Sequence, residues 1–198
     1  MIVEHHSRLS DLYSPFQQGY LNQLEKQIGF STVRLLKEDD REVTVASPVL
    51  NLLMLNVHIL KHAMGLGVGL RQLCDMARAY YKWHGTMEKH ELCEIYRKTG
   101  LLKWSNLLHS VLVEYLGVPV SCLPDDIDKH ESPLPLFHII QQGGNFGYSS
   151  VCRLISRTEW QRKLFTAQSF FRNVRLIFRY APWEGVGMVF TLLKGQAR

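Results

Sequence analysis

The apolar run from Val49 to Leu60 constrains this chain more than any other part of its sequence. Wound into a helix it is apolar on all sides, and a helix of that kind lies at the centre of a fold. His58 and His62 interrupt the pattern one turn apart. After a glycine-rich turn the next segment carries Arg71 and Asp75, which are also one turn apart and so share a helix face.

These four polar residues predict a buried network between two facing helices. A buried polar group without a partner costs about 1–3 kcal/mol, so we expect the two imidazoles to contact an ion pair of Arg71 and Asp75. The simplest role of such a pair is to fix the geometry of the hairpin, because buried ion pairs are weak evidence of stability. Contact with a substrate or a phosphate group is the alternative role.

A metal site at the two histidines is the less favoured interpretation. His58 and His62 have the i, i+4 spacing of zinc ligands on a helix, but Ile59 stands where an H-E-x-x-H enzyme has its glutamate. Asp75 is the only attractive third ligand, and a zinc site needs at least three from the protein. We therefore predict no metal site in this chain.

The rest of the pattern predicts a mainly α fold, a multi-helix bundle with a small β-hairpin near the N-terminus. β-Branched residues recur over 32–36 and 42–46 on either side of an acidic turn, which indicates a hairpin. Apolar periodicity, caps and prolines predict helices over residues 15–28, 48–64, 70–83, 86–100, 101–116, 136–142, 159–180 and 183–194.

The predicted elements divide the chain into two parts. Residues 1–46 form a lead-in of strand, helix and hairpin, and residues 47–198 form a helical domain. The segment 118–135 is rich in proline and acidic residues and is the best candidate for an internal boundary.

Composition excludes several classes of protein. The 198 residues, 46% of them hydrophobic, are enough for a substantial core. The longest apolar run falls short of the roughly 20 residues of a membrane span, and the N-terminus lacks the zones of a secretory signal. We therefore expect a cytoplasmic protein with no membrane partner, whose four cysteines are reduced.

The formal net charge of +5 is concentrated toward the C-terminal end. Arg172, Arg175 and Arg179 recur at helical spacing and form a basic stripe, which could bind an anionic partner. A solvated helix face is the simpler interpretation. The aromatic residues beside the stripe are expected to be core rather than a stacking platform, so we do not expect a nucleic-acid partner.

The sequence GGNFG offers a second anion site. Backbone N–H groups of Gly143, Gly144 and Gly147 could form a concavity, although glycines after a helix more often just reverse the chain. Other catalytic motifs are weak or absent. Cys93 and His90 share a helix but no third residue orients them, and no G-x-S-x-G or P-loop pattern occurs.

Several segments together resemble the later part of an uncharacterised bacterial family of nucleotidyltransferase-like proteins. They are VEHHSRL, HILKH, GVGLRQLCDMA, TGLLKW and GGNFG, and the resemblance covers most of the chain. HILKH followed by GLRQLCDMA is the strongest part, because histidines, glycines, arginine and aspartate match at one spacing. The resemblance implies a helical region that follows a small mixed-sheet catalytic core.

The resemblance also implies Mg²⁺ and a nucleoside triphosphate for an intact family member. In such enzymes a Gly-Ser turn precedes two carboxylates on one strand, and a neighbouring strand adds a third carboxylate to the metal site. Glu4 corresponds to that third carboxylate. The only D-x-D spacing, Asp126 and Asp128, lies in the proline-rich loop without a preceding glycine, and we interpret it as a solvated loop.

One carboxylate cannot hold a pair of metal ions. We therefore expect a truncated or split member that begins inside the last catalytic strand, needs no cofactor alone and does not transfer nucleotides by itself. Its expected partner is the missing or separate nucleotidyltransferase core, beside which Arg71 or His62 would approach phosphate. Oligomers could form through the exposed N-terminal strand edge. The alternative is a non-catalytic interaction module that binds a separate catalytic protein or an anionic partner.

Overall fold

The computed structural model describes residues 11–28, 30–34, 42–65, 67–124, 131–142 and 159–194. It confirms the mainly α architecture with a small two-stranded sheet. The elements are α1 (Pro15–Ile28), β1 (Phe30–Arg34), β2 (Glu42–Ala46), α2 (Pro48–Met64), α3 (Leu70–Trp83), α4 (Lys89–Lys98), α5 (Leu102–Leu116), the 3₁₀ helix η1 (Val120–Cys122), α6 (Leu134–Gln142), α8 (Glu159–Tyr180) and α9 (Pro182–Leu193).

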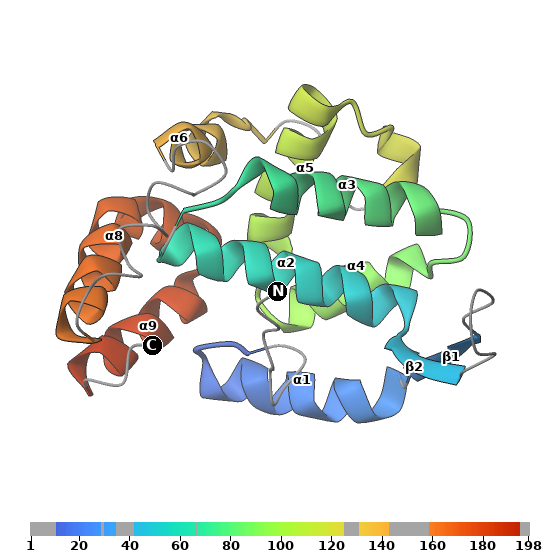
Figure 1. Ribbon diagram of the computed structural model, residues 1–198, viewed down its shortest axis with the longest axis horizontal. Helices are drawn as coiled ribbons and strands as arrows, with labels where there is room; N and C mark the ends of the chain where they lie inside the picture. Colours follow the sequence, from blue (N-terminus) through green and yellow to red (C-terminus); the bar gives the residue numbers. More distant parts are fainter. Residues whose placement is uncertain are drawn as a thin grey trace.

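Helix α2 is the central element of the bundle. Figure 1 shows α3 on one side of it, α1 on the other, α4 and α5 behind, and α8 with α9 at one end. Ser47 begins the helix by accepting a hydrogen bond at Oγ from the Leu50 amide, and Pro48 occupies the first turn, where its missing N–H costs nothing. One cluster of buried apolar residues extends from α1 to α9. The division of the chain at residue 46 stays a prediction.

The predicted hairpin is confirmed with a shift in its first strand. β1 and β2 are antiparallel, with Phe30 opposite Ala46 and Arg34 opposite Glu42. The strand predicted over 32–36 therefore begins and ends two residues earlier, because the register is set by pairing with β2. The strand predicted around Glu4 lies outside the described residues.

Two helix starts and one loop differ from the sequence prediction. Thr86 does not begin α4, because its amide and its hydroxyl both donate to the Trp83 carbonyl and close the end of α3. Helix α6 starts at Leu134 rather than residue 136, with Pro135 in its first turn. The segment predicted as loop over 118–135 contains η1.

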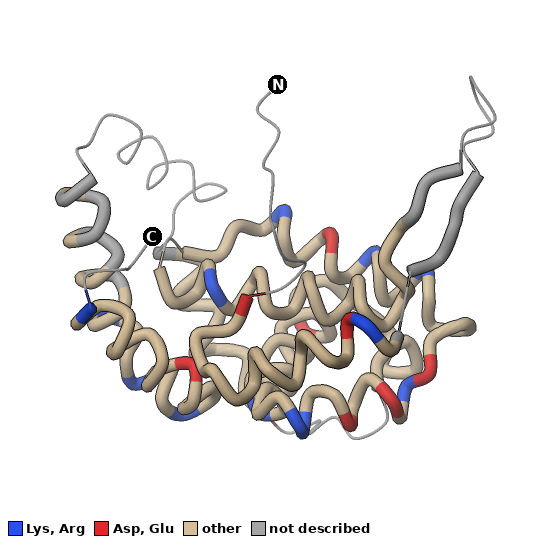
Figure 2. Tube along the Cα trace, turned by 90° about the horizontal axis from the view of Figure 1, so that it is seen from below, with Lys and Arg blue, Asp and Glu red and all other residues tan. Residues whose placement is uncertain are grey.

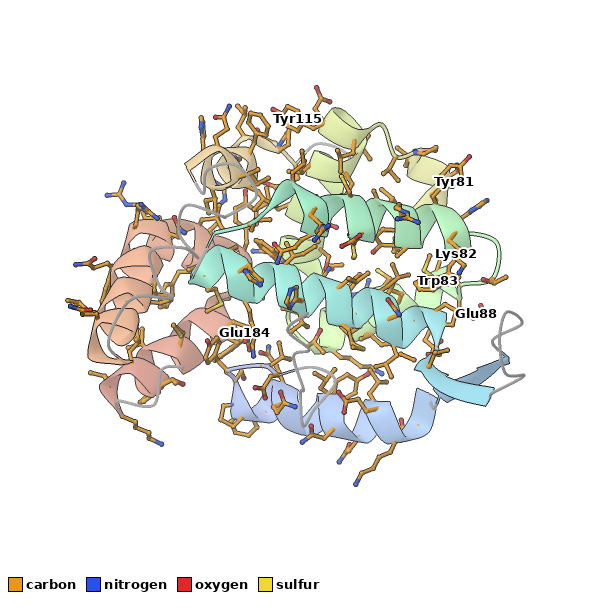
Figure 3. All side chains as sticks on the ribbon, in the orientation of Figure 1. Tyr81, Lys82, Trp83, Glu88, Tyr115 and Glu184 are labelled. Atoms are coloured by element: carbon orange, nitrogen blue, oxygen red, sulfur yellow. The ribbon has the colours of Figure 1, made fainter. Side chains whose placement is uncertain are left out.

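Helices α8 and α9 are tied to the early helices by buried polar groups. The Glu184 carboxylate in α9 accepts hydrogen bonds from the amides of Tyr13 (2.7 Å) and Ser14 (3.0 Å), at the start of α1. Figure 3 shows Glu184 between α9 and α1. On α8, Asn173 Nδ2 donates to the Ala63 carbonyl at 2.9 Å, in the last turn of α2. The Ser14 amide and the Ala63 carbonyl are groups that a helix end leaves without an intrahelical partner, and both contacts supply one.

Charged residues of the described part lie mainly along the outside of the helices (Figure 2). Glu184 is the exception, since it is 1% exposed. In the part of the chain that the structure describes, no helix is long and apolar enough to cross a lipid bilayer.

Packing of α9 against Tyr13 leads to a stability prediction. A Cβ added at Gly187 would lie 2.5 Å from the backbone carbon and oxygen of Tyr13, so G187A must displace α9 from α1. We expect it to lower the free energy of unfolding by about 1–3 kcal/mol, as overpacking does. Denaturant unfolding followed by circular dichroism measures this loss.

Gly19 in α1 provides the matched control, because a Cβ there meets nothing within 4 Å. G19A should leave stability unchanged or raise it by up to about 1 kcal/mol through higher helix propensity. Equal stability of G187A and G19A would contradict the described packing.

Candidate functional site

The outer faces of α2 and α3 both carry polar side chains. On α2, Asn51, His58 and His62 fall on one face, and His58 is exposed while the other two are half-buried. On α3, the exposed charged residues follow the i, i+4, i+7, i+11 pattern of a single face. We define the α2–α3 polar surface by its residues: Asn51, His58, His62, Arg71, Gln72, Asp75, Arg78 and Lys82.

Gln72 links the two helices across this surface. Its Oε1 accepts a hydrogen bond from the Gly69 amide at 3.0 Å, so its amide nitrogen is left to face His58 Nε2 at 3.2 Å. An amide nitrogen can only donate, so Nε2 of His58 accepts in this contact when it carries no proton. The rings of His58 and His62 meet edge to face, with centroids 4.5 Å apart. The structure thus brings the two histidines together and adds Gln72, which the sequence reading missed.

The prediction that His58, His62, Arg71 and Asp75 are buried together is wrong. His58, Arg71 and Asp75 are exposed, and within the described residues no ion pair joins Arg71 to Asp75. The reason is that neighbouring helices pack around most of α2 but leave the face that carries His58 accessible to solvent. The apolar side chains on the outer side of α2 are themselves only partly buried. The nearly continuous hydrophobic sequence therefore did not reveal that this face of α2 is accessible to solvent.

A hollow of about 960 Å³ adjoins the C-terminal half of α3. Asn51 of α2 and Asp75, Arg78 and Lys82 of α3 contribute to its lining, together with the turn that follows α5. Figure 3 shows Tyr81, Lys82 and Trp83 at this end of α3. Its volume is close to the upper end of the range of about 300–1,000 Å³ that small-molecule sites occupy.

A different set of polar side chains forms the buried network. Tyr80 OH lies 2.6 Å from His109 Nε2 and 3.1 Å from Tyr96 OH. Asn56 Nδ2 donates to Ser105 Oγ at 3.0 Å, while Asn56 Oδ1 is buried without a hydrogen-bond partner among the described residues. All five residues are buried, and they join α2, α3, α4 and α5. None of these five residues was among the four predicted for a buried network.

This buried network is uncharged at neutral pH. Burial lowers the pKa of His109 from its ordinary 6.5 to about 3, so the imidazole is neutral. Burial also raises the pKa of Tyr80 and of Tyr96, so both phenols keep their protons. A closed, neutral cluster of this kind positions helices and offers no exposed acid or base.

The family model described as uncharacterised nucleotidyltransferase matches residues 1–117, more than half of the chain. The chain belongs to this nucleotidyltransferase family. No curated protein and no solved structure gives a significant match. The matched region ends where α5 ends, so it contains the whole α2–α3 polar surface and the whole buried network. Helices α6, α8 and α9 of this nucleotidyltransferase-family chain lie beyond the match.

The other predicted site residues divide into those that the structure describes and those that it does not. Glu4 and the glycines Gly143, Gly144 and Gly147 lie outside the described residues, as do Asp126 and Asp128. Arg172, Arg175 and Arg179 are exposed on α8, and Arg179 is 4.0 Å from Glu131. Among the described residues, no three histidine, cysteine or acidic side chains are placed to bind a metal ion.

The state of His109 predicts an acid-dependent loss of stability. Unfolded His109 takes up a proton as the pH falls below 6.5, whereas the folded protein resists this down to about pH 3. The unfolded state therefore binds more protons, and stability must fall with pH in this window. Between pH 7 and pH 5 we expect this residue to cost about 2 kcal/mol of unfolding free energy.

Urea unfolding at several pH values measures this dependence. H109Q should be less stable at pH 7 and lose less stability on acidification. Y80F provides the control, because it removes the hydroxyl but retains the buried imidazole and hence the steep pH dependence. The same pH dependence in H109Q and in the unmodified protein would show that His109 is not the buried titrating group.

Proposed function

We propose that this chain forms the helical part of a nucleotidyltransferase and that its α2–α3 polar surface faces the nucleotide and the acceptor. One observation supports this most strongly. His58, Arg71 and Asp75, all inside the family match, face solvent instead of the core, and His62 is half-buried beside His58. A polar surface held on two rigid helices suits substrate contact, whereas buried side chains would serve architecture alone.

The charges on α3 suit a phosphate chain. Arg71, Arg78 and Lys82 carry three positive charges along one exposed face, and Asp75 carries the single negative charge among them. Guanidinium groups bind phosphate oxygens through paired hydrogen bonds. The nearby imidazoles of His58 and His62 add further polar contacts. This set can hold the triphosphate while an acceptor hydroxyl attacks it, and can stabilise the leaving pyrophosphate.

In this proposal the metal-binding catalytic core lies outside the residues described. The described side chains include no cluster able to hold Mg²⁺, and the 198 residues contain no Gly-Ser turn followed by paired carboxylates. We propose that a core carrying that motif packs beside the α2–α3 polar surface, with Glu4 as its third carboxylate. Mg²⁺ bound there would neutralise the triphosphate. The cytoplasm, which we expect as its location, supplies nucleoside triphosphates.

Inorganic triphosphate tests the surface directly, because it carries the charge of the nucleotide without the base. We expect saturable shifts in amide NMR signals of α2 and α3 at millimolar triphosphate. The R71Q/R78Q variant should bind about tenfold or more weakly, since it loses two charge-assisted contacts.

The matched control is K98Q/K103Q, which removes two exposed positive charges from α4 and α5. It should change the affinity less than twofold, apart from general screening. Shifts spread over the whole protein, or equal weakening by the two double variants, would refute a specific phosphate site on α3.

A further inference from the structure

Helices α8 and α9 expose a large apolar surface outside the family match. Leu193 is 78% exposed, Phe171 63%, Trp183 62% and Phe190 60%. Monomeric proteins seldom leave so many large apolar side chains together in water, and such surfaces mark interaction sites. We define the α8–α9 apolar surface by its residues: Leu164, Phe171, Phe178, Trp183, Val186, Phe190 and Leu193.

The expectation that the aromatic residues of α8 are core is therefore wrong for two of them. Ile177 is fully buried, but Phe171 and Phe178 remain 63% and 40% exposed. They recur with Leu164 every seven residues and so form a straight line along one side of α8.

The two helices form one surface because they pack closely. Gly185 of α9 lies against α8, and a Cβ added there would be 3.1 Å from Ile177 Cγ2 and 3.2 Å from Phe178 Cε2. Val186, Phe190 and Leu193 then fall on the side of α9 that faces outward next to this contact. Exposed apolar side chains from both helices therefore lie near one another, as the docking of an amphipathic helix requires.

Positive charge borders the apolar surface on α8. Arg175 lies between Phe171 and Phe178 on the helix surface, with Arg172 beside it. Neither arginine forms an ion pair with another described residue. Over residues 160–194 the only acidic residue is Glu184, and it is buried against α1.

Because the exposed charges beside the α8–α9 apolar surface are positive, a molecule that binds there should carry negative charge. We propose that the α8–α9 apolar surface docks an amphipathic helix of a partner protein, with acidic residues on the edge of that helix pairing with Arg172 and Arg175. A second copy of this chain that met the same face would bring arginines toward arginines, since no described residue of this face is an exposed acid. The site is separate from the α2–α3 polar surface and does not depend on the proposed nucleotidyl transfer.

A designed peptide tests whether binding to the α8–α9 apolar surface depends on negative charge, without knowledge of the natural partner. The probe is a fluorescent helical peptide of about 18 residues, or five turns, with a leucine and phenylalanine face and glutamates on one edge. A second peptide has lysines in place of the glutamates. Fluorescence anisotropy with the full chain should show saturable binding of the acidic peptide and about tenfold or weaker binding of the basic one.

Charge reversal on the protein provides the decisive comparison. R172E/R175E should bind the acidic peptide about tenfold or more weakly than the unmodified protein does, and should bind the basic peptide more tightly. F190S should weaken both peptides while its circular dichroism spectrum and melting temperature stay unchanged, because Phe190 is exposed. Equal affinity of both peptides for both proteins would overturn the proposal.

Two further measurements distinguish other occupants. The first is sedimentation of the chain with vesicles of phosphatidylglycerol and phosphatidylcholine. If the chain sediments with the vesicles, F190S prevents this, and the acidic peptide does not bind, the occupant is an anionic membrane and the proposed partner helix is overturned. A dimer in analytical ultracentrifugation that F190S converts to monomer would assign the surface to a second copy and overturn the proposal.

Discussion

The arrangement of this protein depends on how α2 is rotated within the bundle. Asn56 lies in an apolar environment, where its amide must meet a partner, and its Nδ2 donates a hydrogen bond to Ser105 on α5. Residues two positions apart on a helix lie on nearly opposite sides. Fixing Asn56 toward the core therefore turns His58 toward solvent, and the outer face of α2 becomes available for function.

The same network fixes α3 beside α2. Tyr80 reaches Tyr96 and His109 from α3, so its outer side, with Arg71 and Asp75, must face away from the core. Because every member of the network is neutral, the helices are held by directional hydrogen bonds without the cost of a buried charge. The network therefore holds α2 and α3 in a fixed arrangement, with the α2–α3 polar surface accessible to solvent.

Sequence patterns predicted the elements far better than they predicted the site. Periodicity, caps and prolines located α1, α3 and α8 to the residue, because those signals act locally. Burial could not be read from α2 in the same way, since a nearly continuous apolar run does not reveal which side the neighbours cover. Asn56 within that run was the one signal of the true network. Glu184 gave a weaker signal, as a lone acid in an apolar helix, because its partners at Tyr13 and Ser14 lie 171 and 170 residues away.

The C-terminal helices connect the family region to a second kind of surface. They lie beyond the matched residues 1–117, yet Glu184 and Asn173 satisfy backbone groups at the start of α1 and the end of α2. This support makes α8 and α9 part of the same folded body. We propose that the family region faces substrate through polar groups, while the added helices bind a protein partner through apolar ones.

Carbethoxylation of histidines tests the central claim, which is that the bundle buries the polar network around His109 and exposes the α2–α3 polar surface that includes His58. The native protein would be treated with diethyl pyrocarbonate, and the modification of each histidine would be followed by peptide mass spectrometry. The account predicts that His58, which is exposed, reacts in the folded protein, while His109 reacts only as the protein unfolds. Protection of His58 equal to that of His109 would contradict it.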